Sequence, residues 1–381
     1  MAKRLAYLDG LRAVAVLSVI VFHLRVHAPG VALEPWAKEC SHGVDLFFVL
    51  SGFCLAFPTF DALRATGQAR FDTVSFALKR LLRIFPPYAA AVVLISAIGA
   101  IALARGIPLP QGMHPYNAAD VVDELLFVDG NREHINASFW SLAVEFRWYF
   151  LFPLALLLAA RNLRAFVTAL LLVAAAGELT RASSTDLGVL PAFMLGIVAA
   201  ALRTSGHRII RFAPILMLVS VGVALLNETR PHFPIQTNVG WHAAAFFFVI
   251  FAGEQQILTR ILSFPLLTRI GVASYSIYLV HEPIVSATVA ALRPRYGDVW
   301  SSLAAASLGL LAGFALWIVL ERPLTRPDLV RNFVRRNEAG VAKLFAAAGI
   351  PRSFTIGAPS AKLVAFPRPV AEQPPLERTA V

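Results

Sequence analysis

The amino-acid sequence predicts an all-α integral membrane protein, a polytopic bundle of about ten transmembrane helices with both termini in the cytoplasm. Three observations support this fold class. First, hydrophobic residues make up 57% of the 381-residue chain and charged residues only 15%, whereas soluble domains are typically about one-quarter charged. Second, the apolar residues are gathered into long continuous runs rich in alanine and leucine. Third, basic residues are concentrated in alternate connections between these runs.

The apolar runs have the length that a membrane-spanning helix requires. A bilayer core about 30 Å thick is crossed by roughly 20 apolar residues of α-helix. A transmembrane β-barrel would instead show short segments of alternating polarity, which these continuous runs do not. By this criterion the spans are expected near residues 11–29, 43–60, 84–104, 139–160, 164–179, 187–203, 209–226, 239–253, 269–291 and 300–320.

The loop charges orient the predicted helices. Most of the Lys and Arg residues lie in the chain start, in the connections near 61–83, 161–164, 203–211 and 260–269, and in the segment after residue 321, and such segments stay on the cytoplasmic side. Both termini are then cytoplasmic, in agreement with an even number of spans. This topology accounts for the net charge of +11. Nucleic-acid binding is excluded, because the basic residues lie between apolar runs instead of covering one water-facing surface.

The composition divides the chain near residue 325. Residues 1–325 contain all the apolar runs and are expected to form one transmembrane domain. Residues 326–381, rich in Pro, Ala, Arg and Lys, are expected to form a basic, partly disordered cytoplasmic tail. Within this tail, a basic helix near 328–348 would lie on the anionic inner leaflet, and the chain from about 351 would be disordered.

Polar side chains inside apolar runs mark the candidate functional site, because a charge at the centre of a membrane helix costs roughly 2.5–3.5 kcal/mol. In the first span, Arg12 and His23 are eleven residues apart, which places them about 16 Å apart on one helix face. Arg12 would bind phosphate near the inner boundary, and His23 would act as a general base deeper in the membrane. The alternatives are snorkelling of Arg12 to the headgroups and an interhelical hydrogen bond of His23.

A pair of arginines lies just inside the predicted inner boundary of the third span. Arg80 and Arg83 share a helix face at this spacing, and two guanidinium groups offer fixed donors to phosphate. Anchoring by the positive-inside rule is the alternative. The prolines that follow, Pro86 and Pro87, are expected to break or kink the helix.

Two carboxylates are the remaining candidates for acid–base chemistry. Asp45 is expected near the outer interface, where it would orient a histidine. Glu145 enters the fourth span among aromatic residues, as a catalytic or substrate-binding carboxylate. An ion pair with Arg147 is the alternative for Glu145, although residues two apart point away from each other on a helix.

Three other side chains are assigned to substrate binding: Ser51, Trp140 and His281. Simple packing beside Gly52 is the alternative for Ser51, and a hydrogen bond across the bundle is the alternative for His281. The sequence contains no glycine-rich phosphate loop, zinc-binding HExxH motif or metal-spaced cluster. No metal and no permanently bound cofactor is therefore expected.

Taken in order, these segments resemble the membrane acyltransferase 3 family, whose members O-acylate sugars and related acceptors. The resemblance covers roughly residues 5–325, and it implies that residues 1–325 form an acyltransferase domain of the stand-alone type, without the carboxy-terminal esterase-like domain of some members. The family often has a second acidic or amide residue after the glutamate, where this chain has Phe146. The resemblance rests on DGLRAVAVLSVIVFH, GVDLFFVLSGF, RLLRIFPPY, WSLAVEF, LPAFMLGIVAA, SYSIYLVHEP and the closing ERP.

The resemblance implies an acyl-CoA donor, most often acetyl-CoA, which enters from the cytoplasm. Its implied partners are membrane lipid and a carbohydrate or glycolipid acceptor, met at or beyond the midplane of a bacterial inner membrane. The three arginines would bind the donor phosphates, and His23 would deprotonate the acceptor hydroxyl while Asp45 or Glu145 orients its ring. In a variant, His23 takes the acyl group covalently and passes it outward.

Two functions from other classes are open. A transporter or flippase for a lipid or glycan would use the intramembrane His, Arg and Glu residues as a proton or substrate path, although the chain shows no paired inverted halves. A non-catalytic sensor or scaffold would not need so many polar residues inside spans. The sequence leaves the acceptor, the acyl chain length and the oligomeric state undefined.

Overall fold

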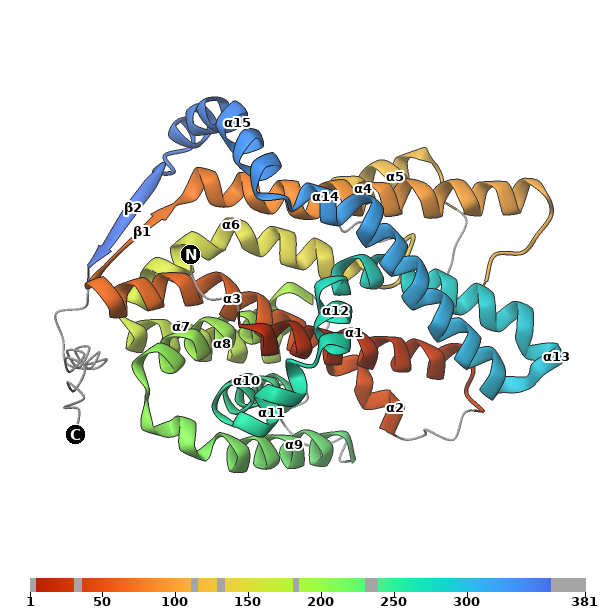
Figure 1. The fold of residues 1–381 in the computed structure, drawn as a ribbon, viewed down its shortest axis with the longest axis horizontal. Coiled ribbons are helices and arrows are strands. Elements are labelled where there is room, and N and C mark those ends of the chain that lie inside the picture. Colours follow the sequence, from red (N-terminus) through yellow and green to blue (C-terminus); the bar gives the residue numbers. More distant parts are fainter. Residues whose placement is uncertain are drawn as a thin grey trace, which may run out of the picture.

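The computed structural model describes residues 5–30, 36–110, 116–128, 134–180, 185–229 and 239–357. Long helices form a bundle in which most axes run roughly side by side (Figure 1). The elements are α1 (Ala6–His27), α2 (Trp36–Glu39), α3 (Gly43–Thr66), β1 (Gln68–Asp72), α4 (Thr73–Ala104), α5 (Ala118–Leu125), α6 (Phe139–Arg161), α7 (Leu163–Leu179), α8 (Thr185–Ser205), α9 (Ala213–Thr229), α10 (Val239–Glu254), α11 (Gln256–Leu262), α12 (Pro265–Val272), α13 (Ser274–Leu316), α14 (Arg322–Leu324), α15 (Pro327–Ala347) and β2 (Ser353–Gly357).

The chain is an all-helical, multi-pass membrane protein. Within the described ranges, seven helices are long and apolar enough to cross a membrane, or eight if the bent pair α10 and α11 forms one span. The number of ten stays a prediction, because α7 has only 17 residues and the last two expected spans are joined in α13. That helix is interrupted at Gly297, where φ is 70°, and its two arms pack together because Gly313 lies against Ile277.

The adjacent prolines of the third span lie inside a continuous helix. Pro86 and Pro87 fall near the middle of α4, which continues to Ala104. Of the two expectations, a break is therefore wrong, and a kink stays a prediction. Each proline removes the donor for the carbonyl four residues earlier, and membrane helices tolerate this loss where neighbouring groups compensate.

The hydrophobic core consists of two large clusters, and α1 contributes to both. The first joins α1 to α3, α6, α8 and α10, and the second joins α1 to α4, α12 and α13. In the first cluster α3 and α8 approach closely at two glycines. A Cβ added to Gly52 would collide with the carbonyl oxygen of Phe193, and one added to Gly196 would collide with that of Val49. Gly52 therefore serves helix packing.

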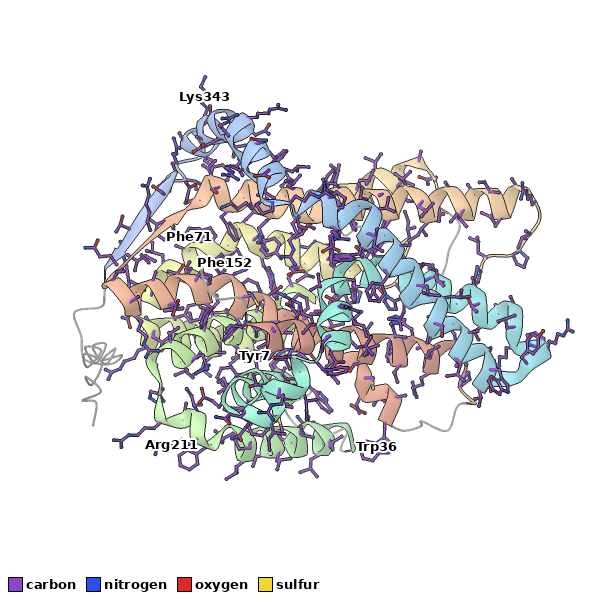
Figure 2. The ribbon with its side chains drawn as sticks, viewed as in Figure 1. Tyr7, Trp36, Phe71, Phe152, Arg211 and Lys343 are labelled. Carbon is purple, nitrogen blue, oxygen red and sulfur yellow. The ribbon has the colours of Figure 1, made fainter. Side chains whose placement is uncertain are left out.

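The segment after the last membrane helix is partly folded. The basic helix expected near 328–348 is present as α15. The expected disorder from about 351 is wrong for residues 353–357, which form β2 and pair antiparallel with β1, Asp72 opposite Ser353. This pairing is reinforced by stacking of Phe71 on Phe354, whose ring centroids are 5.3 Å apart, and Figure 2 shows Phe71 beside Phe152 of α6. Residues 358–381 lie outside the described residues.

Both described ends of the chain lie at the same end of the bundle. The start of α1 and the β1–β2 sheet are found together, away from the turn of α13 at Gly297 (Figure 1). This arrangement agrees with an even number of passes. The assignment of this end to the cytoplasm stays a prediction from the loop charges.

Replacing Gly52 by leucine should destabilise the protein. The new side chain would be forced against the backbone of α8, and overpacking of this kind costs about 1–3 kcal/mol. The shift is measured as the thermal unfolding midpoint of the purified protein in detergent. Gly222→Leu in α9 is the matched control, because a Cβ there meets nothing within 4 Å. Equal midpoints for the two variants would contradict the close α3–α8 contact.

Candidate active site

A cavity lies inside the membrane domain between α1, α3, α4, α6 and α13. Five of the residues predicted from the sequence meet there: Arg12, Ser51, Arg80, Arg83 and Glu145. They come from four helices that are far apart in the sequence. The complete lining is Arg12, Val44, Phe47, Phe48, Ser51, Cys54, Leu55, Arg80, Arg83, Ile84, Ser141, Leu142, Glu145, Tyr149, Ser274, Tyr275 and Tyr278.

The three arginines give the cavity a positive charge that the protein compensates only in part. Arg12 donates to Asp9 at 2.9 Å and contacts the sulfur of Cys54 at 3.3 Å. Arg80 and Arg83 have no carboxylate partner among the described residues, and Nε of Arg80 is buried without a hydrogen bond. Unpaired guanidinium groups in an apolar setting are costly. The arrangement therefore favours an anionic ligand over plain anchoring at the inner boundary.

Glu145 also lines the cavity and is held by two hydroxyl groups. Its Oε1 accepts a hydrogen bond from Ser51 and another from Tyr149 at 2.6 Å. The alternative for Glu145, an ion pair with Arg147, is not found among the described residues. Arg147 instead pairs with Asp186 through two hydrogen bonds of 3.1 Å and 2.9 Å. Glu145 is thus a fixed acceptor facing the cavity.

His23 and His281 are bonded to each other across the α1–α13 interface. Nδ1 of His281 lies 2.9 Å from the carbonyl oxygen of Tyr278. Because a carbonyl oxygen can only accept a hydrogen bond, Nδ1 of His281 carries the proton. Nε2 of neutral His281 then accepts a hydrogen bond from Nδ1 of His23 at 3.1 Å. The same Nδ1 of His23 also lies 2.9 Å from the carbonyl oxygen of Val19. The interhelical hydrogen bond is therefore present. Since Nδ1 of His23 carries the proton, Nε2 of His23 keeps the lone pair that a general base requires.

Tyr278 lies between the cavity and these two histidines. Its ring centroid is 5.6 Å from that of His281, and its ring meets Phe47 edge-on at 5.8 Å. The hydroxyl groups of Tyr278 and Ser141 share a hydrogen bond of 2.6 Å. Tyr278, Phe47 and Ser141 line the cavity, whereas His23 does not. Arg12 and Tyr278 thus line the cavity, and Tyr278 connects its wall to His281 and, through His281, to His23.

Asp45 is not placed beside His23. Its two carboxylate oxygens bind Nδ1 of His42 at 2.6 Å and Nε2 of His242 at 3.1 Å, and Asp45 and His242 are both buried. Among the described residues, His23 has no hydrogen bond to Asp45 or Glu145. Trp140 packs at the edge of the first core cluster, outside the cavity lining.

Sequence reasoning missed several groups that shape this site. Tyr149, Tyr275, Tyr278, Ser141 and Cys54 all line the cavity. Hydroxyl and thiol side chains are common in membrane helices, where they often serve packing. The available signal was position. Tyr149 follows Glu145 by one helical turn, and Ser141 precedes it by one turn, so all three share a face.

Comparisons with known proteins show the family of the chain. A family profile described as an acyltransferase domain, the acyltransferase 3 family, matches residues 5–322. The chain belongs to this acyltransferase family. YrhL of Bacillus subtilis, provisionally named a peptidoglycan O-acetyltransferase, is 25% identical over 369 residues, which cover 86% of this chain and 56% of YrhL.

Two further relatives are similar over much of the chain. The peptidoglycan O-acetyltransferase OatA of Listeria monocytogenes is 22% identical over 374 residues, 87% of this chain and 57% of OatA. A provisionally named O-acetyltransferase of Staphylococcus aureus is 24% identical over 332 residues, 74% of this chain and 52% of that protein. The chain spans about half the length of these curated relatives. No solved structure matches it.

Asp45→Ala should lower the free energy of unfolding by about 1–3 kcal/mol, because a buried histidine loses its hydrogen-bond partner. His242, which is 1% exposed, has no second carboxylate partner among the described residues. Thermal unfolding of the purified protein measures the loss, and Asp61→Ala on the exposed end of α3 is the control. An unchanged midpoint together with abolished acyl transfer would assign Asp45 to the chemistry instead.

Proposed function

We propose that this protein is a membrane-bound O-acyltransferase that moves an acyl group, in the first instance acetyl, from cytosolic acyl-CoA to a hydroxyl group of a carbohydrate or glycolipid. The observation that carries the proposal is the cavity with three guanidinium groups, two of them without a carboxylate partner among the described residues. Membership of the acyltransferase family supports the reaction class.

The arginines fit the phosphate groups of coenzyme A. Guanidinium groups bind phosphate oxygens through short, charge-assisted hydrogen bonds. Arg12 lies within the first two turns of α1, and Arg80 and Arg83 lie within the first three turns of α4. These turns are at the end of the bundle that the loop charges assign to the cytoplasm. A cytosolic donor would thus meet the arginines first and extend its thioester toward Tyr278.

His23 is proposed as the general base. Its unprotonated Nε2 would take the proton from the acceptor hydroxyl as the oxygen attacks the thioester carbonyl carbon. The carbon–sulfur bond then breaks, and the proton passes from His23 to the leaving thiolate of coenzyme A. His281 holds the ring in the required tautomer through its hydrogen bond to Nδ1, the role that a carboxylate plays in other dyads.

Tyr278 adds a condition to this mechanism. Because its ring lies between the donor cavity and the histidines, the thioester can reach Nε2 of His23 only after the ring turns aside. The hydrogen bond to Ser141 holds the closed position. Separation of the base from the donor cavity would protect the thioester from water until the acceptor arrives.

The acceptor and the location are proposed from the relatives. Two relatives are named for O-acetylation of peptidoglycan, and all those described are bacterial proteins. A glycan of the cell envelope is therefore the proposed acceptor class, reached from the outer side of a bacterial inner membrane. His23 lies in the last two turns of α1, toward that side.

Release of free thiol from acetyl-CoA tests the function. The assay uses the purified protein in lipid nanodiscs with an extract of envelope glycans. His23→Ala should lower the rate about 10²–10⁴-fold, the usual contribution of a general base, and Arg12→Ala should also abolish normal turnover. His207→Ala on an exposed loop is the control. Near-normal thiol release by the His23→Ala variant would reject His23 as the general base. If the Glu145→Gln variant then lost thiol release, Glu145 would be assigned as the base instead.

Arg80→Gln should raise the KM for acetyl-CoA about ten- to hundredfold, because a hydrogen bond to a charged group contributes about 1.5–3 kcal/mol. Initial rates at varied acetyl-CoA concentration give the KM. Lys79→Gln is the control, because it removes the same charge one residue away from Arg80. Lys79 is exposed and does not line the cavity, so this variant should leave the KM for acetyl-CoA unchanged. Equal effects of both variants would show a general electrostatic role and contradict phosphate binding by Arg80.

A further inference from the structure

Helix α15 and strand β2 form an arm outside the region that matches the acyltransferase family. The match ends at residue 322, and α15 covers Pro327–Ala347. In Figure 1 the arm lies along the outer side of α4 and reaches back to β1. Its attachment to the membrane domain therefore lies outside the part of the chain that the family profile covers and calls for its own explanation.

The arm packs on α4, and its far end is bonded to the start of that helix. The carbonyl oxygen of Arg352 accepts from the backbone N–H of Thr73 at 3.0 Å, at the first residue of α4. Helix α4 has 32 residues, more than the roughly 20 that cross the bilayer core, so part of it extends beyond the core. The arm is attached to the end of α4 that carries Arg80 and Arg83.

Helix α15 has two chemically different faces. The half-buried face carries apolar side chains that include Val330, Phe333 and Phe345. The opposite face is exposed and carries Arg335, Arg336 and Lys343, none of which has a carboxylate partner among the described residues. Figure 2 shows Lys343 projecting away from the bundle.

Two exposed leucines flank the basic face. Leu344 is 70% exposed and Leu329 is 37% exposed, and at helical spacing both lie at the border between the apolar and basic faces. The two acidic residues of α15 are already engaged, Asp328 with Arg331 and Glu338 with Arg352. The helix thus presents uncompensated positive charge beside exposed apolar side chains.

We propose that α15 is an interfacial helix that binds anionic lipid headgroups through Arg335, Arg336 and Lys343 while Leu344 and Leu329 enter the acyl-chain boundary. A basic face bordered by leucines is the pattern that lies in the plane of an anionic membrane. Juxtamembrane Lys and Arg residues are attracted to the negative surface of the cytoplasmic leaflet. The position of α15, where α4 leaves the bilayer, places these groups at headgroup depth.

Lipid is favoured over the nucleotide end of coenzyme A as the anion. A soluble nucleotide would not use the exposed leucines that border the basic face. The proposal does not depend on the acyl-transfer activity, and its test needs no turnover.

Accessibility of an engineered cysteine tests this orientation. The full chain with Leu344→Cys is placed in nanodiscs of phosphatidylcholine alone or with phosphatidylglycerol. Modification by an uncharged polyethylene-glycol maleimide is followed by mass spectrometry of the α15 peptide. Labelling should be slower by about tenfold or more in the anionic nanodiscs. Adding Arg335→Gln, Arg336→Gln and Lys343→Gln should remove that difference.

A second triple variant, Arg161→Gln, Arg164→Gln and Arg211→Gln, is the control for net charge. These arginines are exposed and belong to other connections at the same end of the bundle, so the lipid-dependent protection should persist. Equal labelling in both lipid compositions would overturn the proposal. Protection in phosphatidylcholine nanodiscs on addition of coenzyme A would also overturn it, because the donor nucleotide would then be the anion.

Discussion

The arrangement of this protein depends on positive charge enclosed in an apolar domain. Arg12, Arg80 and Arg83 come from two helices that cross the membrane, and among the described residues Asp9 is the one carboxylate bonded to them. Three consequences follow from this imbalance. The helices must be packed tightly enough to hold the side chains in place. In the proposed function, the cavity admits the anionic donor. The proposed chemistry must then be shielded from the side where the donor enters.

The packing around α1 meets the first of these requirements. This helix belongs to both core clusters, and it also carries Arg12 near one end and His23 near the other. Any change in its position would therefore alter the donor cavity and the pair of histidines together. In the proposed mechanism the ring of Tyr278 provides the shielding, since it lines the cavity, contacts His281 and is held by Ser141.

The sequence predicted the features that depend on local pattern. Apolar runs predicted the helices, and a charge within such a run is improbable enough to single out Arg12, Arg80 and Glu145. Features that depend on distant partners could not be predicted. Asp45 bonds to His242, which is remote in the sequence, and the place near His23 is taken by His281. The β2 strand was missed because its partner β1 begins far upstream, so its composition resembled a disordered tail.

The pairing of β1 with β2 has a consequence for the biogenesis of the protein. Residue 72 leaves the ribosome early, but its partner, residue 353, follows only after every membrane helix has been synthesised. Until then β1 is an unpaired edge, the kind of surface that promotes aggregation, and Phe71 lacks its stacking partner. Closure of this small sheet therefore marks a chain whose membrane helices have all been synthesised, and a chain terminated before β2 would keep β1 as an unpaired edge.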